Sequence, residues 1–266
     1  MALNGLSFIH LELSSMCNKS CWFCGRRRIE KDFPSLANWG FMEKEMVYEI
    51  SKQVPEGITV HMHNNGEPLL YSDLGWALSS FSHCIRGFNT NGKLLLEKAD
   101  EIIGNLETLT ISVVQDDPEG DDQIEILQKF ITKKNGRKPF LIYRLLGKID
   151  KERTETFSRL PGIIARRVLH APEGSFEYEK KVCIPEVGIC LDLLTHLAID
   201  RFGNVNLCVR FDPEGELRIG NIEEITLEEA WTSDKRRYYI EKHIEQKRKE
   251  LPGCSRCEYF GVPRGE

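Results

Sequence analysis

The chain has 266 residues, a length that accommodates one barrel-sized domain and a small appendage. Charged residues make up 29% and hydrophobic residues 41%, as in an ordinary globular protein, and the formal net charge of −5 argues against a general nucleic-acid binder. No apolar run approaches the roughly 20 residues of a membrane-spanning helix, and the first residues lack the features of a secretory signal. We therefore expect a cytoplasmic protein with neither a membrane nor a nucleic-acid partner.

Apolar runs typical of strands alternate with amphipathic helical stretches through the first part of the chain. This alternation is the pattern of parallel β/α units. Strands are predicted at residues 8–13, 58–63, 85–88, 106–114, 140–145 and 163–169. Turn signals delimit helices predicted at residues 43–53, 74–81, 94–104, 124–134 and 151–160. The expected fold class is α/β, with a partial (β/α)6 barrel over residues 1–172.

The pattern changes after about residue 172 to cysteines, short strands and one charged helix through residues 230–249. This change predicts a small second domain over residues 173–266. We interpret the Glu-, Lys- and Arg-rich final helix as a solvated face rather than a binding tail.

Three cysteines follow the first predicted strand at the spacing CxxxCxxC: Cys17, Cys21 and Cys24. The nine cysteines of a cytoplasmic chain stay reduced, which favours metal or cluster ligation over disulfides. Three thiolates fit three irons of a [4Fe–4S] cube and leave one iron open, whereas a closed electron-transfer cluster takes four cysteines. An open position invites a further ligand. A zinc site completed by a histidine is the alternative for the same thiols.

The spacing resembles that of the radical S-adenosylmethionine (SAM) superfamily. The resemblance implies that the open iron binds the amino and carboxylate groups of SAM. Reductive cleavage of the S–C5′ bond would then give a 5′-deoxyadenosyl radical. The family also places an aromatic residue just before the third cysteine, beside the adenine, and Phe23 occupies that position.

The end of the second predicted strand resembles the GGE segment of the same family. The resemblance assigns Gly66 and Glu67 to the ammonium group of SAM, with Glu67 supplying the charge. Asn65 departs from the usual first glycine, while Gly66 still allows a close backbone approach.

Two further segments also match family positions in the expected order. Thr90 and Asn91 belong to a turn similar to the family's TNG turn, and Ser112 stands where related enzymes contact the ribose or the carboxylate of SAM. Arg144 is interpreted either as a partner of the SAM carboxylate or substrate, or as a surface arginine. A GxIxG adenine motif is not evident. In parallel β/α barrels ligands gather at the carboxyl ends of strands, where all these segments are predicted to lie.

Inward positions on the early strands add possible substrate contacts at His10, Glu12, His61 and His63. None is assigned individually, because alternation along a strand makes about half of such residues point away.

A second set of cysteines occupies the last third of the chain, at Cys190, Cys208, Cys254 and Cys257, with Gly203 preceding the second of them. The arrangement resembles the twitch domain, a shortened form of the SPASM domain. The resemblance implies four thiolates closing an auxiliary [4Fe–4S] cluster, with the glycine forming a hairpin between the first two. Residues 218–222 and the following helix with Trp231 are similar to the segment that links these halves. A structural zinc site built from the same thiols is the alternative.

Two cysteines and a run of arginines have no assigned role in this scheme. Cys84 is interpreted as a core residue and Cys183 as a buried reduced thiol, with a substitute-ligand role for Cys183 left open. The run 26–28 is equally compatible with binding an anionic group and with a solvated surface.

Within the superfamily the whole chain resembles the aminocyclitol alcohol dehydrogenases. The resemblance implies two [4Fe–4S] clusters, SAM, and a flavodoxin- or ferredoxin-type electron donor. It further implies two-electron oxidation of a secondary alcohol on a sugar-like or cyclitol substrate. Peptide or protein modification, by thioether crosslinking or sulfatase-type maturation, is an alternative, and so is epimerisation. A zinc-stabilised binding module without catalysis is the alternative from a different class.

Overall fold

The computed structural model describes residues 3–167, 169, 189–208, 212 and 214–257. Its centre is one sheet with the strand order β6-β5-β4-β3-β2-β1-β7-β8-β9 in the described part of the chain. The strand bounds are β1 Phe8–Leu11, β2 Thr59–His61, β3 Ile85–Thr90, β4 Thr108–Val114, β5 Phe140–Leu146, β6 Ile163–Arg167, β7 His196–Ile199, β8 Asn204–Asn206 and β9 Arg218–Asn221.

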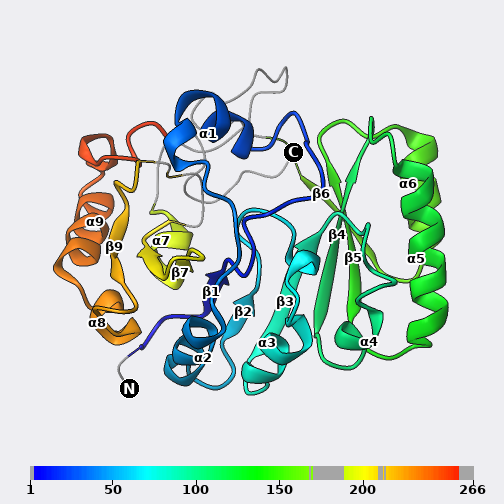
Figure 1. Cartoon of the computed structure of the whole chain (residues 1–266). Helices are drawn as coiled ribbons and strands as arrows, with labels where there is room; N and C mark the ends of the chain where they lie inside the picture. The colour runs from blue at the N-terminus through cyan, green and yellow to red at the C-terminus, as the bar shows by residue number, and fades with distance from the viewer. Residues whose placement is uncertain (1–2, 168, 170–188, 209–211, 213, 258–266) are drawn as a thin grey trace.

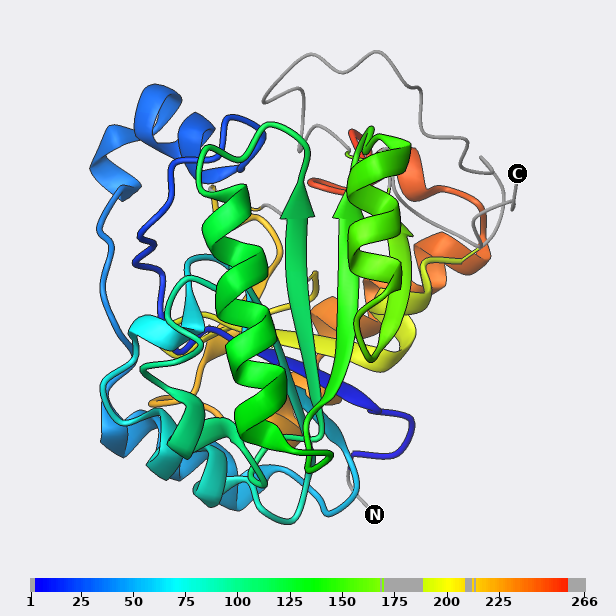
Figure 2. The ribbon, with the colours of Figure 1, turned by 90° about the vertical axis from the view of Figure 1, so that its right-hand side faces the viewer.

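Strands β1 to β6 run parallel, each pairing with the next in sequence. Parallel strands joined by helical crossovers are what the alternating pattern predicts, so the expected α/β partial barrel is confirmed. The helices pack on its outer face, and in Figure 2 helices α5 and α6 lie over strands of the sheet. The helix bounds in this half are α1 Arg26–Asp32, α2 Lys44–Gln53, α3 Leu74–Ser80, α4 Ala99–Ile102, α5 Gly120–Lys134 and α6 Lys151–Ser158, with short 3-10 turns at Pro34–Leu36 and Pro68–Leu70.

The sheet stays open and is extended on its β1 side. Strand β7 pairs in parallel with β1, and β8 and β9 then add in antiparallel orientation. The main apolar core also combines residues from both parts of the chain, including Leu11 with Leu197 and Trp231. The two predicted domains therefore share one sheet and one core. Their predicted boundary at 172/173 lies outside the described residues and stays a prediction.

Helices in the last third are shorter than predicted. The single helix expected at 230–249 is divided into α8, Leu227–Trp231, and α9, Asp234–Ile244, followed by a 3-10 turn at Arg248–Glu250. Thr226 forms a capping box with Glu229 at the start of α8, and the Ser233 side chain caps α9. Two N-caps only seven residues apart start two helices, because each side chain satisfies the free N–H groups of its own first turn. Helix α7, Leu191–Thr195, precedes β7.

The prediction of a helix at 94–104 is wrong over most of its length. Only Ala99–Ile102 is helical, and turns carry the preceding leucines. Leu95 is nevertheless fully buried in the core. The apolar residues that suggested a helix are therefore explained by core packing. No helix in the described part of the chain is long and apolar enough to cross a membrane.

An ion pair fixes the start of strand β4 to strand β3. The Arg86 guanidinium donates to the Glu107 carboxylate at 3.0 and 2.9 Å, and the Arg86 backbone N–H donates to it at 2.8 Å. Burial acts to raise the pKa of Glu107, but hydrogen bonds from Arg86 and Lys138 outweigh it and lower the pKa from 4.5 to about 2. The charged carboxylate is therefore favoured in the folded state.

We expect Glu107→Gln to lower the free energy of unfolding at pH 7 by about 3 kcal/mol, because it leaves the Arg86 charge, 9% exposed, without its counterion. A carboxyl with a lowered folded pKa stabilises the fold above its unfolded value and loses this effect as the pH falls through the folded value. The difference in free energy of unfolding between Glu107→Gln and the natural sequence should therefore become smaller as the pH falls from about 5 to about 2. Urea unfolding measures this difference. The matched control is Glu125→Gln in the exposed Glu125–Lys129 pair, which should change stability by less than about 0.5 kcal/mol at either pH. An equal loss in both variants would contradict the prediction.

Candidate functional site

The first three cysteines lie in one loop at the carboxyl end of β1. Cys17, Cys21 and Cys24 are free and half-buried. Burial, together with the nearby thiols of Cys24 and Cys17, raises the pKa of Cys21 to about 11. Thiols crowded in this way ionise readily only around a positively charged centre. The donor set fits an iron–sulfur cluster. No group of three His, Cys, Asp or Glu residues among those described is arranged to hold a single metal ion.

Contacts from three later segments hold this loop in place. The Glu67 backbone N–H donates to the Met16 carbonyl oxygen at 2.7 Å. The Asn91 side chain donates to the Asn18 side chain at 2.8 Å, and Lys19 pairs with Asp117 at 2.6 Å. The loop is therefore positioned by the carboxyl ends of strands β2, β3 and β4.

Glu67 is a buried carboxylate that organises the predicted SAM segments. It is 2% exposed and accepts hydrogen bonds from Leu69 N, from Thr90 Oγ1 and from Asn91 N, at 3.0, 2.8 and 2.8 Å. Burial raises the pKa of Glu67 to about 7, and these hydrogen bonds oppose the rise. Glu67, Thr90 and Asn91 are thus brought together. Three of the acceptor positions of Glu67 are therefore used by contacts within the protein, although the motif assigns this carboxylate to the ammonium group of SAM.

Gly66 allows the β2 loop to lie directly against the backbone before Cys17. Its φ is +71°, and a Cβ added there would lie 2.3 Å from the Ser14 carbonyl oxygen and 2.6 Å from that of Met16. The predicted close approach is present, but it is an approach to the protein's own backbone.

Ser112 and Arg144 occupy register-paired positions on β4 and β5. Both face the concave side of the sheet and both are half-buried.

Gln123 is a site residue that no motif in the sequence indicates. Its amide donates to the carbonyl oxygens of Asn91 and Ser112 at 2.8 and 3.0 Å. Gln123 is 3% exposed and links the β3 turn to the end of β4. In the sequence it is marked only by its position one residue before the helix predicted at 124–134.

The concave face of the barrel is polar and carries a row of imidazoles. His10 on β1 and His61 on β2 have ring centroids 5.5 Å apart. His63, which follows β2, has its ring centroid 6.1 Å from that of His61. Burial, together with neighbouring charges that include Arg144, lowers the pKa of His61 and of His63 to about 3. These imidazoles are therefore neutral at physiological pH. Parity along the strands places all three side chains on the inner face.

The arginines that follow the cluster loop are engaged within the protein. Arg26 is buried with its guanidinium 4.3 Å from the Trp39 ring centroid, Arg27 pairs with Glu30, and Arg28 lies 3.4 Å from Asp32. All three belong to α1, which is labelled in Figure 1. Phe23 packs edge-on against Trp22 in the cluster loop.

The second set of cysteines surrounds a small apolar cluster. Cys190, Cys208 and Cys254 pack against buried Leu193, Leu207, Leu217, Tyr239 and Leu251. Burial, together with nearby Cys190 and Cys257, raises the pKa of Cys254 to about 12. Cys254 thus lies near Cys190 and Cys257, and Cys208 packs against the same apolar cluster. Thiolates are the usual ligands of an iron–sulfur cluster, so this donor set suits one.

Contacts in the backbone explain how these thiols meet. Gly203 lies in the turn between antiparallel β7 and β8, as the hairpin prediction requires. Arg248 donates to the carbonyl oxygens of Cys254 and Cys257, and the Cys190 N–H donates to His243 Nδ1 at 3.4 Å. Cys84 is a core residue at 6% exposure, as expected. Cys183 lies outside the described residues.

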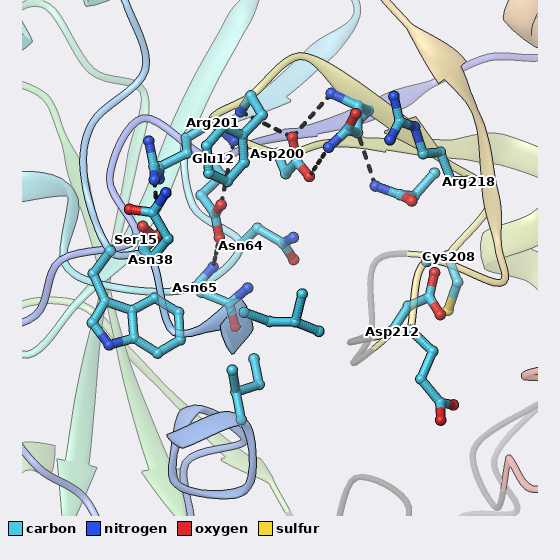
Figure 3. Close-up of a pocket in the computed structure, with 18 residues that line it drawn as sticks. Glu12, Ser15, Asn38, Asn64, Asn65, Asp200, Arg201, Cys208, Asp212 and Arg218 are labelled. Atoms are coloured by element: carbon cyan, nitrogen blue, oxygen red, sulfur yellow. Dashed lines mark hydrogen bonds between the residues drawn. The ribbon is translucent and has the colours of Figure 1, made fainter. Parts of the chain in front are cut away.

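A cavity of about 340 Å³ lies between the first cysteine loop and the second cysteine set (Figure 3). Glu12, Ser15 and Asn64 line it from the barrel, and Arg201 and Cys208 line it from the last third of the chain. Volumes of about 300–1,000 Å³ are usual for small-molecule sites. The lining is rich in asparagine and carboxylate side chains, which suits a polar ligand with several hydroxyl groups.

Comparison with known proteins finds one matching domain family and several structures with the same fold. Residues 190–258 match the SPASM family, described as an iron–sulfur cluster-binding domain. The computed structure is similar to that of BtrN in complex with AdoMet and 2-DOIA, with a TM-score of 0.61 and 19% identity over 98% of this chain and 96% of BtrN. No curated protein sequence matches.

A second protein has the same fold. SuiB of Streptococcus suis bound to S-adenosylmethionine gives a TM-score of 0.56 at 14% identity, over 96% of this chain and 72% of SuiB. SuiB bound to its precursor peptide SuiA gives 0.56 at 15% identity, over 86% of this chain and 65% of that one. The chain therefore has the fold of BtrN and SuiB, and residues 190–258 match an iron–sulfur cluster-binding domain of the SPASM family. The individual ligand and SAM-binding roles predicted above stay predictions.

Proposed function

We propose that this protein is a radical SAM oxidoreductase that removes two electrons from a secondary alcohol on a sugar-like or cyclitol substrate. In this proposal Cys17, Cys21 and Cys24 hold the SAM-binding cluster. Cys190, Cys208, Cys254 and Cys257 hold an auxiliary cluster. The observation that carries the proposal is the polar cavity lined both by Ser15, two residues before Cys17, and by Cys208.

When bound, the clusters and SAM supply a 5′-deoxyadenosyl radical and an acceptor for one electron. The protein's own residues must bind and orient the substrate between these two sites. Asn64 and Ser15 offer donors and acceptors for hydroxyl groups, and Glu67 with Thr90 and Asn91 orders the segments proposed to hold SAM. Cleavage of SAM requires an external one-electron donor, for which we propose a protein of the flavodoxin or ferredoxin type.

Peptide modification is the second candidate, because the fold is shared with SuiB, which was solved with a precursor peptide. The size of the cavity favours the small-molecule reading, since about 300–1,000 Å³ holds a ligand of drug size and not a long peptide. Epimerisation of a small polar substrate is compatible with the same cavity.

The proposal is tested by reconstituting the protein anaerobically, reducing it, and supplying SAM with a panel of polyols. We expect about eight irons per chain, the number for two [4Fe–4S] clusters, and a ketone formed together with 5′-deoxyadenosine. The products are identified by mass spectrometry. A colourless protein that binds zinc would support the non-catalytic alternative. Cleavage of SAM without a ketone from any polyol would argue against alcohol oxidation, and modification of a supplied peptide would favour the second candidate.

A further inference from the structure

Glu12 is a buried carboxylate in the wall of the cavity between the two sets of cysteines. It follows directly after β1 and lies five residues before Cys17. It is 4% exposed, and it lines the same cavity as Cys208. Figure 3 shows Glu12 beside Asn65 and Arg201, with Cys208 and Asp212 on the other side.

Backbone donors from two different strand ends fix both oxygens of this carboxylate. Asn65 N donates to Oε1 at 3.0 Å, and Arg201 N donates to Oε2 at 3.3 Å. No lysine, arginine or histidine side chain forms an ion pair with Glu12 in the described part of the chain. A carboxylate has about four acceptor positions, so these bonds leave acceptor capacity at both oxygens. Glu12 is thus held rigidly while retaining capacity to accept a proton.

Burial and one neighbouring charge shift the pKa of Glu12 upward. Burial raises the pKa of Glu12, and the nearby Asp200 carboxylate raises it further, while hydrogen bonds from Asn65 and Arg201 act in the opposite direction. The Arg201 guanidinium is directed elsewhere, donating to the Asn38 carbonyl oxygen and stacking on Phe202. A raised pKa brings a carboxylate closer to the operating pH, which suits a general base.

The other acidic groups in the cavity wall have structural tasks. Asp200 accepts from Phe202 N, Asn204 N and the Asn204 side chain, which together build the β7–β8 turn. Asp212 accepts from Glu216 N and Leu217 N, and Glu214 pairs with Arg256 at 3.3 Å. The inner-face imidazoles are poor proton acceptors, because burial and Arg144 disfavour the imidazolium form of His61 and His63.

Resting on the proposed function, we infer that Glu12 is the catalytic residue that accepts the hydroxyl proton of the substrate alcohol. The alcohol loses its carbon-bound hydrogen as an atom to the 5′-deoxyadenosyl radical. It loses its hydroxyl proton to a Glu12 carboxylate oxygen and one electron to an iron–sulfur cluster. These losses convert the C–O single bond into a carbonyl group, and 5′-deoxyadenosine and protonated Glu12 account for both hydrogens.

The test follows the two hydrogens separately. With a polyol deuterated at carbon, Glu12→Gln should still transfer deuterium into 5′-deoxyadenosine, because the amide leaves hydrogen-atom abstraction possible. Ketone formation should fall by about 100-fold or more, the usual contribution of a general base. Glu12→Asp, which retains a carboxylate, should restore part of the ketone. The ketone rate of the natural sequence should decline toward acid pH with a midpoint above the ordinary value for glutamate, and this limb should be absent in Glu12→Gln.

Electron paramagnetic resonance of the clusters and thermal unfolding report whether the variants are loaded and folded. The exposed Glu56→Gln serves as the control and should match the natural sequence in both products. Ketone formation by Glu12→Gln within about threefold of the natural rate would overturn the inference, since a general base contributes far more. Loss of both deuterium transfer and ketone in a folded, loaded variant would assign Glu12 to substrate binding and would also overturn it. If the natural sequence forms no ketone, the proposed reaction itself fails, and the role of Glu12 fails with it.

Discussion

Replacing Cys21 with alanine is expected to abolish formation of 5′-deoxyadenosine. Cys21 is the central member of a loop in which the two other thiols lie close enough to raise its pKa. With only two thiolates the cube has no secure attachment, and SAM has no open iron to bind. We expect the iron content to fall to about half, because the auxiliary cluster keeps its own four ligands. Iron analysis and chromatographic detection of the nucleoside measure both effects.

Cys84→Ala is the matched control for this experiment. Cys84 is a single core thiol whose nearest polar partner is the Pro55 carbonyl oxygen, at 3.8 Å from the sulfur. Its removal should cost about 1 kcal/mol of stability through lost packing and leave iron content and nucleoside formation unchanged. Undiminished nucleoside formation by Cys21→Ala, with full iron, would refute the assignment of the first cluster.

Gly66→Ala should be strongly destabilising, because the new methyl group would lie 2.3 Å from the Ser14 carbonyl oxygen. Two costs add: about 1–2 kcal/mol for a side chain in the left-handed region and about 1–3 kcal/mol for overpacking against atoms that cannot move freely. The backbone has to shift where Glu67 N donates to Met16 O. That shift should displace the cluster loop and weaken SAM binding at least about tenfold, since each 1.4 kcal/mol is one factor of ten.

Gly57→Ala separates these two costs. Gly57 has a similar φ of +81°, but nothing lies within 4 Å of an added Cβ. It should therefore lose only the backbone contribution of about 1–2 kcal/mol and keep SAM binding. Urea unfolding and SAM titration of the two variants provide the comparison. Equal losses of stability would show that the contact with Ser14 has no energetic effect.

The sequence predicted the parallel half of the fold well, because its signals are local. Strand β5 alternates between buried and more exposed residues, and helix α5 before it ends at the Asn135–Gly136 turn. The prediction failed at residues 94–98, where apolar residues pack into the core from turns. It also failed at 232–233, where the Ser233 cap starts a new helix. The hydrophobic pattern of a segment does not distinguish a continuous helix from turns or two short helices, because apolar residues can be buried in any of these conformations.

The candidate site could be predicted only in part for a related reason. Glu67, Thr90 and Asn91 were identified from motifs, and the structure brings them together. Gln123 was missed because its two acceptors, at Asn91 and Ser112, belong to different strands. Glu12 was noted but not selected over His10, because both have the parity of the inner face. What separates them is the contact of Glu12 with the loops after β2 and β7.

The sequence by itself determined the two sets of cysteines, the order of the motifs and the parallel β/α half, since spacing and periodicity are properties of neighbouring residues. Only the tertiary structure decided that β7 extends the sheet beside β1. It also decided that Cys208 lines a cavity with Glu12, and that the arginines of α1 are engaged within the protein. The physical reason is that these features depend on contacts between residues up to nearly 200 positions apart, as for Glu12 and Arg201. Such contacts form only when the whole core packs.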